Sequence, residues 1–244
     1  MDLYIYEETT STNDLARRET FGHGDAIWAY HQSAGRGQRG NKWVGGEGEN
    51  ITFSVVLEPR FLDAVDQFYI SQITALALTE AMAEFGIETK IKWTNDIYVD
   101  DYKLAGILIE NGLMDGVVGR SVVGIGLNVN QLAFDPSLPN PTSMRLLRGG
   151  RFPLEMVLQT IRLRLVEWCA RLEQGEREAI KSCYHSRLYR CGEQHQYRLA
   201  SGEVVEAVIE GVEPHGELIL RHSNGRTKGY LFREVEFIIE SRGR

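Results

Sequence analysis

The fold of this chain is decided by residues 89–130, which read TKIKWTNDIYVDDYKLAGILIENGLMDGVVGRSVVGIGLNVN. Turn residues at 100–102 and 114–116 interrupt the apolar runs of this stretch. Alternating apolar runs and turns are typical of consecutive β-strands. The stretch therefore predicts four strands joined by tight turns: 89–93, 97–99, 103–111 and 116–130.

Upstream of this stretch, short strands are expected at 3–6, 25–31 and 51–57. A helix between the first two has Ser11 or Thr12 as its expected N-cap. Such a mixture of strands and helices predicts an α+β domain.

Three longer helices are also expected. Apolar residues recur at helical spacing from Val65 to Phe85, and Gly86 follows them, which predicts an amphipathic helix that ends at the glycine. A second helix begins near Pro153, and a third covers residues 176–188. The prediction is thus a mixed sheet flanked by helices over residues 1–188.

The residues after Arg190 have a different texture. Short alternating segments are separated by turn pairs at 201–202, 215–216 and 224–225. The last pair, Asn-Gly, favours a type I′ turn. A meander of this size predicts a small β domain over residues 189–244, folded as a five-stranded barrel or roll.

Composition excludes several classes of protein. The 244 residues suffice for one large domain, or one large and one small. Three cysteines without C-x-x-C spacing argue against a disulfide framework or a zinc site and for the reducing cytoplasm. Neither a signal peptide nor a membrane span is visible. A net charge of −7 does not suit a general nucleic-acid binder.

A glycine-rich stretch, His31–Asn50, is the most informative candidate site. Six glycines between positions 35 and 48 are interleaved with Arg36, Arg39 and Lys42, and Trp43 stands among them. Glycines let backbone amides approach an anion, arginines bind phosphate or carboxylate, and an aromatic ring can stack on a purine. The spacing fits neither a Walker A loop nor a Rossmann fingerprint. The alternative is a flexible surface loop, and the backbone entropy of the glycines predicts poor order without ligand.

Three further stretches carry candidate polar residues. Lys103 begins the apolar run KLAGILIE, where its ammonium suits an anion, although an edge-strand lysine is the alternative. Asn95 and Asp96 precede it in a turn, where such residues are common for local reasons. The run VVGIGLNVNQ ends in Asn128 and Asn130, and its glycines are compatible with close packing alone. Residues 9–14, TTSTND, also fit a simple helix cap.

Together these stretches resemble the biotin protein ligase family, in order and spacing, from about residue 8 to residue 130. The signature is GRG-x-RG-x-x-W combined with KW-x-ND-x8-K-L-A-G-I-L-x-E. The resemblance implies a class II synthetase-like sheet domain followed by a small SH3-like β-barrel. It also implies a biotin pocket formed by Ser11, Thr12, Asn13, Gln32, Gly35, Arg36, Gly37 and Lys103. The ATP-binding residues that it implies are Arg39, Lys42, Trp43, Asn95 and Asn128.

The resemblance further implies the reaction. Lys103 and Arg36 would be the catalytic residues that bring the biotin carboxylate to the α-phosphate of ATP, with Mg²⁺ as cofactor and unknown metal ligands. The expected product is biotinyl-5′-AMP, and the expected acceptor is a lysine of a biotin carboxyl carrier protein. Gln38 departs from the pattern, because several members carry arginine there, so a role for this position is in doubt.

Two other functions are compatible with parts of this pattern. Lipoate ligases and octanoyl transferases resemble the family in fold and in their lysine, but their paired-arginine and G-G-G motif is missing from this sequence. Some family members are repressors with an N-terminal helix-turn-helix. The STN motif begins here at residue 11, which leaves no room for one, so no DNA binding is expected. A monomer and a homodimer are both compatible with the sequence.

Overall fold

The structure is a computed structural model of the chain, and it describes residues 1–239 except 41, 44 and 47. A seven-stranded sheet forms its centre, in the order β1-β2-β3-β7-β6-β5-β4. Its strands are β1 (Leu3–Thr9), β2 (Ala26–Gln32), β3 (Ile51–Leu57), β4 (Lys90–Lys92), β5 (Asp96–Val99), β6 (Tyr102–Met114) and β7 (Val117–Leu127). Strands β1 and β2 pair in parallel and the other neighbours pair antiparallel, which confirms the mixed sheet.

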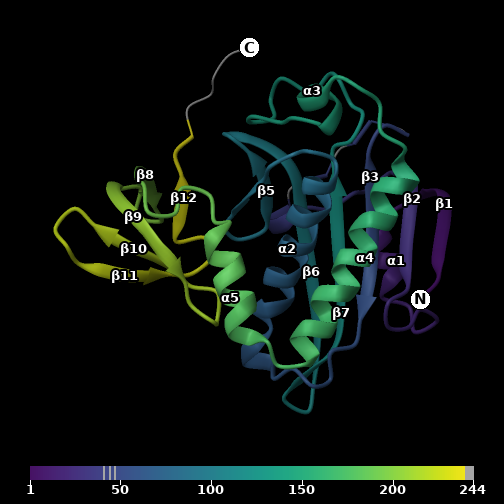
Figure 1. The fold of residues 1–244 in the computed structure, drawn as a ribbon, viewed down its shortest axis with the longest axis horizontal. Helices are drawn as coiled ribbons and strands as arrows, with labels where there is room; N and C mark the ends of the chain where they lie inside the picture. The colour runs from purple at the N-terminus through teal and green to yellow at the C-terminus, as the bar shows by residue number, and fades with distance from the viewer. Residues whose placement is uncertain (41, 44, 47, 240–244) are drawn as a thin grey trace.

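Helices cover both faces of this sheet (Figure 1). On one face, α1 (Thr12–Ala16) packs over β2, β3 and β7. On the other, α2 (Phe68–Glu84) packs over β4 to β6, and α4 (Leu154–Glu173) packs on α2. Side chains alternate between the faces of a strand. Val55 therefore lies in the large core with α2 and α4, whereas Val56 lies in the small core beneath α1.

The helix expected from Val65 begins three residues later, at Phe68. A short 3-10 turn over Ala64–Asp66 precedes it, and Gly86 follows its end with φ +70°. This helix is buried on nearly every side, so the expectation of an amphipathic helix is wrong. The reason is tertiary: the sheet, α4 and α5 (Arg177–Ser186) enclose it.

Other boundaries agree closely with the sequence. Strand β3 covers the expected residues 51–57, and α4 begins directly after Pro153. A β-branched run specifies the first, and a regular apolar stripe specifies the second. Sequence alone does not predict α3 (Met144–Arg148), which is too short to show a period.

The C-terminal strands form a separate antiparallel sheet beyond α5 (Figure 1). Its order is β11-β10-β9-β8-β12. These strands are β8 (Gln194–Leu199), β9 (Val204–Val212), β10 (Leu218–His222), β11 (Thr227–Tyr230) and β12 (Val235–Phe237). This arrangement is consistent with an SH3-like domain, although within the described residues no pairing of β11 with β12 closes it into a barrel.

The turn at Asn224–Gly225 is not the predicted type I′ turn. Such a turn requires positive φ at both central residues. Gly225 has φ +78°, but Asn224 is not in the left-handed region. The amide of His222 donates to the carbonyl oxygen of Arg226 at 2.9 Å, so three residues form the loop, with the glycine last.

The C-terminal sheet packs against residues of the large sheet that the sequence marks as a motif. Nε1 of Trp93 donates to the carbonyl oxygen of Gly216 at 2.9 Å. Nζ of Lys92 lies 4.8 Å from the ring centre of Phe237. The start of the KWTND motif is therefore fixed in part by the C-terminal strands.

No helix in the described part of the chain is long and apolar enough to cross a membrane.

Candidate active site

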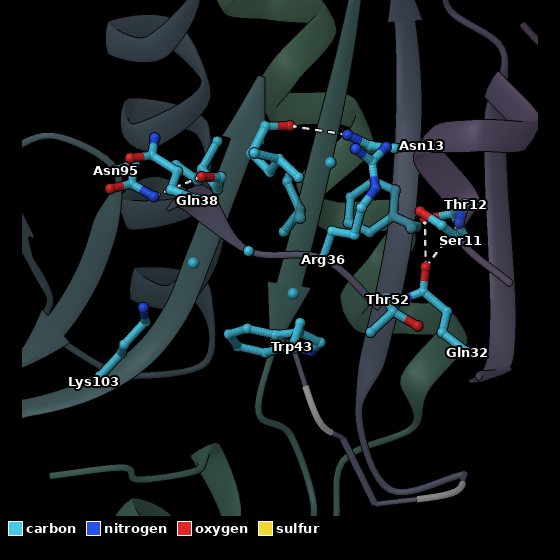
Figure 2. A pocket seen from close by; sticks show the side chains of 18 residues that line it. Ser11, Thr12, Asn13, Gln32, Arg36, Gln38, Trp43, Thr52, Asn95 and Lys103 are labelled. Atoms are coloured by element: carbon cyan, nitrogen blue, oxygen red, sulfur yellow. Dashed lines mark hydrogen bonds between the residues drawn. The ribbon is translucent and has the colours of Figure 1, made fainter. Parts of the chain in front are cut away.

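A pocket opens on the α1 face of the large sheet (Figure 2), with about 480 Å³ of empty space that includes solvent at its mouth. Most of the residues proposed from the sequence line it: Ser11, Thr12, Asn13, Gln32, Arg36, Gly37, Trp43, Asn95 and Lys103. The structure adds Gln38, Thr52, Phe53, Gly106, Ile107, Leu108, Gly124, Ile125 and Gly126.

Three glycines form a floor without side chains. Gly106 pairs with Gly126 across β6 and β7, and Gly124 lies two residues before Gly126, on the same face. A Cβ at Gly126 would lie 2.2 Å from the ring of Trp43, and one at Gly124 would lie 2.2 Å from Oδ1 of Asn13. Both side chains therefore lie where they do because the strand beneath them has no Cβ. This is a more specific role than the close packing that the sequence suggests.

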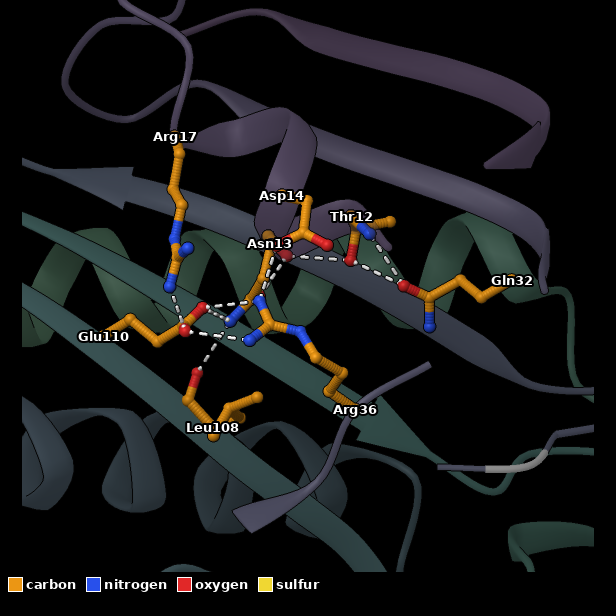
Figure 3. Close-up of polar contacts among 9 residues, drawn as sticks. Thr12, Asn13, Asp14, Arg17, Gln32, Arg36, Leu108 and Glu110 are labelled. Carbon is orange, nitrogen blue, oxygen red and sulfur yellow. Dashed lines mark hydrogen bonds and ion pairs between the residues drawn. The ribbon is translucent and has the colours of Figure 1, made fainter. Parts of the chain in front are cut away.

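The STN triplet belongs to a hydrogen-bond network with β2 and β3 (Figure 3). The amide of Thr12 donates to Oε1 of Gln32 at 2.7 Å. The hydroxyl of Ser54 lies 2.8 Å from Oγ1 of Thr12 and 2.6 Å from Oδ1 of Asn13. Ser11 occupies the N-cap position of α1, as expected, but its side chain makes no capping hydrogen bond. Thr12 and Asn13 are therefore organised mainly by contacts with the sheet.

Glu110 connects this triplet to the glycine-rich segment (Figure 3). Its carboxylate accepts from Nδ2 of Asn13 at 2.8 Å and from Arg36 at 3.1 Å, and it also pairs with Arg17. Arg36 forms a second ion pair with Asp14, at 2.6 Å. The guanidinium that the sequence assigns to substrate anions is thus held by two carboxylates.

Trp43 follows Arg36 in the glycine-rich segment and is fixed by backbone contacts. Its amide donates to the carbonyl oxygen of Gly35 at 3.0 Å, and Arg36 and Lys42 form an antiparallel bridge. The indole lies over Gly126, and its Nε1 is buried without a hydrogen-bond partner in the described part of the chain. An unpaired buried donor is unfavourable, so a ligand atom that accepts from it would stabilise the site.

Lys103 reaches the pocket from the start of β6. Its Nζ lies 2.7 Å from Oδ1 of Asp96, whose carboxylate is also 3.9 Å from Nζ of Lys92. Burial lowers the pKa of Lys92, although Asp96 opposes this effect. Strand β6 lies between β5 and β7, so the alternative of an edge-strand lysine is wrong. Asn95 is fixed nearby, because its Nδ2 donates to the carbonyl oxygen of Ile107 at 2.7 Å.

Four predicted site residues are placed differently or cannot be placed. Gly35 is buried close to the carbonyl oxygen of Trp43, Lys42 is exposed, and neither lines the pocket. Asn128 is buried, and its amide donates to a backbone carbonyl outside the pocket. The side chain of Arg39 lies outside the described residues, as do positions 41, 44 and 47 of the glycine-rich segment. The expected lack of order without ligand therefore stays a prediction.

Comparison with known proteins now identifies the family. Residues 5–128 match the biotin/lipoate A/B protein ligase family. The chain is also 32% identical over 227 residues to the biotin--[acetyl-CoA-carboxylase] ligase of Paracoccus denitrificans, across 89% of this chain and 93% of that protein. The chain belongs to this family.

Other similar proteins include a bifunctional ligase/repressor and a biotin protein ligase of solved structure. The bifunctional ligase/repressor BirA of Escherichia coli is 29% identical over 219 residues, which cover 87% of this chain and 66% of that protein. The biotin protein ligase from Aquifex aeolicus, solved in complex with biotin and ATP, has a TM-score of 0.83 at 24% identity. It covers 98% of this chain and 99% of its own, so the two proteins share a fold.

The family match encloses the whole pocket, because every residue that lines it falls within residues 5–128. Three polar residues that hold the site residues in place, Ser54, Asp96 and Glu110, receive no site role from the sequence. Ser54 looks like one polar residue in an apolar strand, and Asp96 looks like a turn residue. The sequence could have placed Glu110 on the same face of β6 as Gly106 and Leu108, because every second side chain of a strand lies on one face. Which other residues meet on that face depends on the strand register.

Proposed function

We propose that this pocket is the active site in which the chain, an ATP-dependent biotin protein ligase, forms biotinyl-5′-AMP. A carboxylate oxygen of biotin attacks the α-phosphorus of ATP, and pyrophosphate leaves. The amine of an acceptor lysine then attacks the acyl carbon, and AMP leaves. The acceptor is one lysine of a biotin carboxyl carrier protein.

The arrangement of two cations around one pocket carries this proposal. Arg36 enters from the glycine-rich segment and Lys103 enters from β6 (Figure 2). The biotin carboxylate and the triphosphate repel each other, so positive charge must offset that repulsion where they meet. Before substrates bind, Asp14 and Glu110 hold Arg36, and Asp96 holds Lys103. Substrate anions would replace these carboxylates as partners.

The two ends of the pocket suit the two substrates. At one end, amide and hydroxyl groups of the STN triplet and Gln32 can hydrogen-bond the ureido ring of biotin. Arg36 and Gly37 would line the path to its carboxylate. At the other end, Trp43 would pack against adenine, and its unpaired Nε1 would gain an acceptor. The remaining proposed ATP contacts are Arg39, Lys42 and Asn95.

Mg²⁺ is proposed to enter with ATP. Among the described residues, no three His, Cys, Asp or Glu side chains converge into a metal-binding group. This fits Mg²⁺, which commonly binds through substrate phosphates and keeps several waters.

The deciding experiment offers the purified chain ATP, Mg²⁺ and a biotin carboxyl carrier domain, with either biotin or lipoate. Mass spectrometry of the carrier should show one biotinyl group on one lysine, and no modification with lipoate. Transfer of lipoate without transfer of biotin would refute the proposal and support the lipoate/octanoate alternative. Relatives named as biotin ligases favour the first outcome.

We further propose that the chain acts in the cytoplasm, as a monomer or homodimer, without binding DNA. Its net charge of −7 supports the last point, because operator binding needs a basic surface. A gel-shift titration with random and genomic DNA at physiological salt tests it. A stable, sequence-specific complex would be the contrary result.

A further inference from the structure

The backbone of Lys103 is held by a segment far away in the sequence. Strand β6 pairs with β7 only from Ala105 onward. The backbone of Lys103 therefore has no hydrogen-bond partner in β7. Residues 140–142 take the place of β7. The amide of Lys103 donates to the carbonyl oxygen of Asn140 at 2.7 Å, and its carbonyl oxygen accepts from the amide of Thr142 at 2.9 Å.

Asn128 fastens this segment to the end of β7. Its amide donates to the carbonyl oxygen of Leu104 at 3.0 Å, and its carbonyl oxygen accepts from the amide of Met144 at 3.1 Å. Its side-chain Nδ2 donates to the carbonyl oxygen of Thr142 at 2.9 Å. With 5% of its surface exposed, Asn128 acts inside the fold. It is also not among the residues that line the pocket.

We propose that Asn128 is a positioning residue for Lys103, acting through the carbonyl oxygen of Thr142. This inference rests on the proposed function. It assigns Asn128 to the placement of Lys103 and not to contact with the nucleotide. Thr142 links the two residues, because its amide donates to the carbonyl oxygen of Lys103 and its own carbonyl oxygen accepts from Asn128. Loss of the Asn128 donor leaves that buried carbonyl unsatisfied, and the segment shifts to regain a partner. Lys103 then shifts with it, away from Asp96.

Small displacements of this kind matter for catalysis. A misplacement of about 1 Å can reduce a rate by about 10²-fold, because reacting groups must be aligned. The ammonium of Lys103 is at the end of a flexible stem, so its location depends on where the backbone of that stem starts. The structure thus separates the residue that carries the charge from the residue that sets its position.

The test compares Asn128→Asp with Thr142→Val. The first keeps the shape of the side chain and removes its donor. The second keeps the carbonyl oxygen and removes a hydroxyl, Oγ1, that is buried without a partner in the described part of the chain. If Asn128→Asp does not fold, Asn128→Ala replaces it.

Two measurements are made on each variant. In single-turnover assays, Asn128→Asp should form biotinyl-5′-AMP about 10²-fold more slowly, with ATP and biotin affinities within about threefold of wild type. Without substrates, an amine-reactive reagent should label Lys103 several-fold faster, because its ion pair with Asp96 is loosened. Peptide mass spectrometry gives that rate. Thr142→Val should match the wild type in both.

Unchanged labelling of Lys103 together with weakened ATP binding would overturn the proposal and assign Asn128 to the nucleotide. Equal defects in both variants would also overturn it, because they would indicate a general effect on the segment. The labelling result does not depend on the proposed function. Failure of the wild type to form the adenylate would refute that function separately.

Discussion

Replacing Gly124 with alanine should damage the biotin end of the site by a defined route. The added Cβ would lie 2.2 Å from Oδ1 of Asn13 and 2.9 Å from its Cγ. Carbon and oxygen atoms that are not bonded do not approach so closely, and close-packed interiors leave little room to adjust. Asn13 would therefore have to leave its position.

The size of the effect follows from the hydrogen bonds that Asn13 would lose. Ser54 lies 2.6 Å from its Oδ1, and its Nδ2 donates to the charged Glu110 at 2.8 Å. A neutral hydrogen bond contributes about 0.5–1.5 kcal/mol and one to a charged group about 1.5–3 kcal/mol. The glycine-to-alanine change itself restores about 0.4–1 kcal/mol by restricting the unfolded chain. The free energy of unfolding should thus fall by roughly 1–4 kcal/mol.

Biotin affinity, measured by calorimetry, should fall at least about tenfold, because a tenfold loss requires only about 1.4 kcal/mol. Urea unfolding followed by circular dichroism gives the stability. Gly112→Ala is the matched control, since its Cβ would meet the carbonyl oxygen of Arg120 at an ordinary 3.6 Å. If Gly124→Ala bound biotin and resisted urea as well as Gly112→Ala, the explanation of the glycine floor would be refuted.

Further predictions concern the other parts of the site and one cysteine. Gly126→Ala should displace Trp43 and weaken ATP binding while leaving biotin binding intact; the opposite pattern in calorimetry would contradict this. Trp43→Ala should weaken ATP binding by roughly 1–3 kcal/mol, the contribution of a base stacked on an aromatic ring, and a collapse of biotin affinity alone would show that the assignment is wrong. Lys103→Ala should stay folded but form the adenylate about 10²–10³-fold more slowly in a pyrophosphate-release assay; a near-normal rate would remove this lysine from the mechanism. Burial, with a smaller contribution from Glu173, raises the pKa of the Cys169 thiol to about 12. At pH 8 only about one Cys169 thiol in 10⁴ would be ionised in the native protein. Unfolding in urea removes the burial, so iodoacetamide should modify Cys169 far faster in urea than in the native protein. Equal rates would contradict this prediction.

Much of the fold and part of the site can be predicted because their causes are local. The β-branched run 51–57 specifies β3, and the apolar stripe after Pro153 specifies α4. The resemblance to the biotin protein ligase family likewise implies that Arg36, Trp43 and Lys103 belong to one site, and all three line one pocket. The inferences of β3 and α4 rest on residue type and spacing along a single segment.

The rest was decided by contacts between segments distant in the sequence. Strand register places Ser54 beside Gly124, and Gly124 beside Leu108, so that Asn13 lies over a glycine. Neither partner strand carries information about that register in its own composition, because register is fixed only when one buried face meets another. Glu110 similarly becomes a partner of Asn13 through packing.

The sequence by itself thus determined which chemical groups the protein contains and which local elements carry them. The tertiary structure decided which of those groups meet. Asn128 illustrates the difference: the family resemblance implies a residue near the nucleotide, and the fold brings its side-chain amide to the carbonyl oxygen of Thr142, beside the backbone of Lys103. The physical reason is that a hydrogen bond depends on the distance and angle between two atoms. Those quantities exist only once the chain has folded.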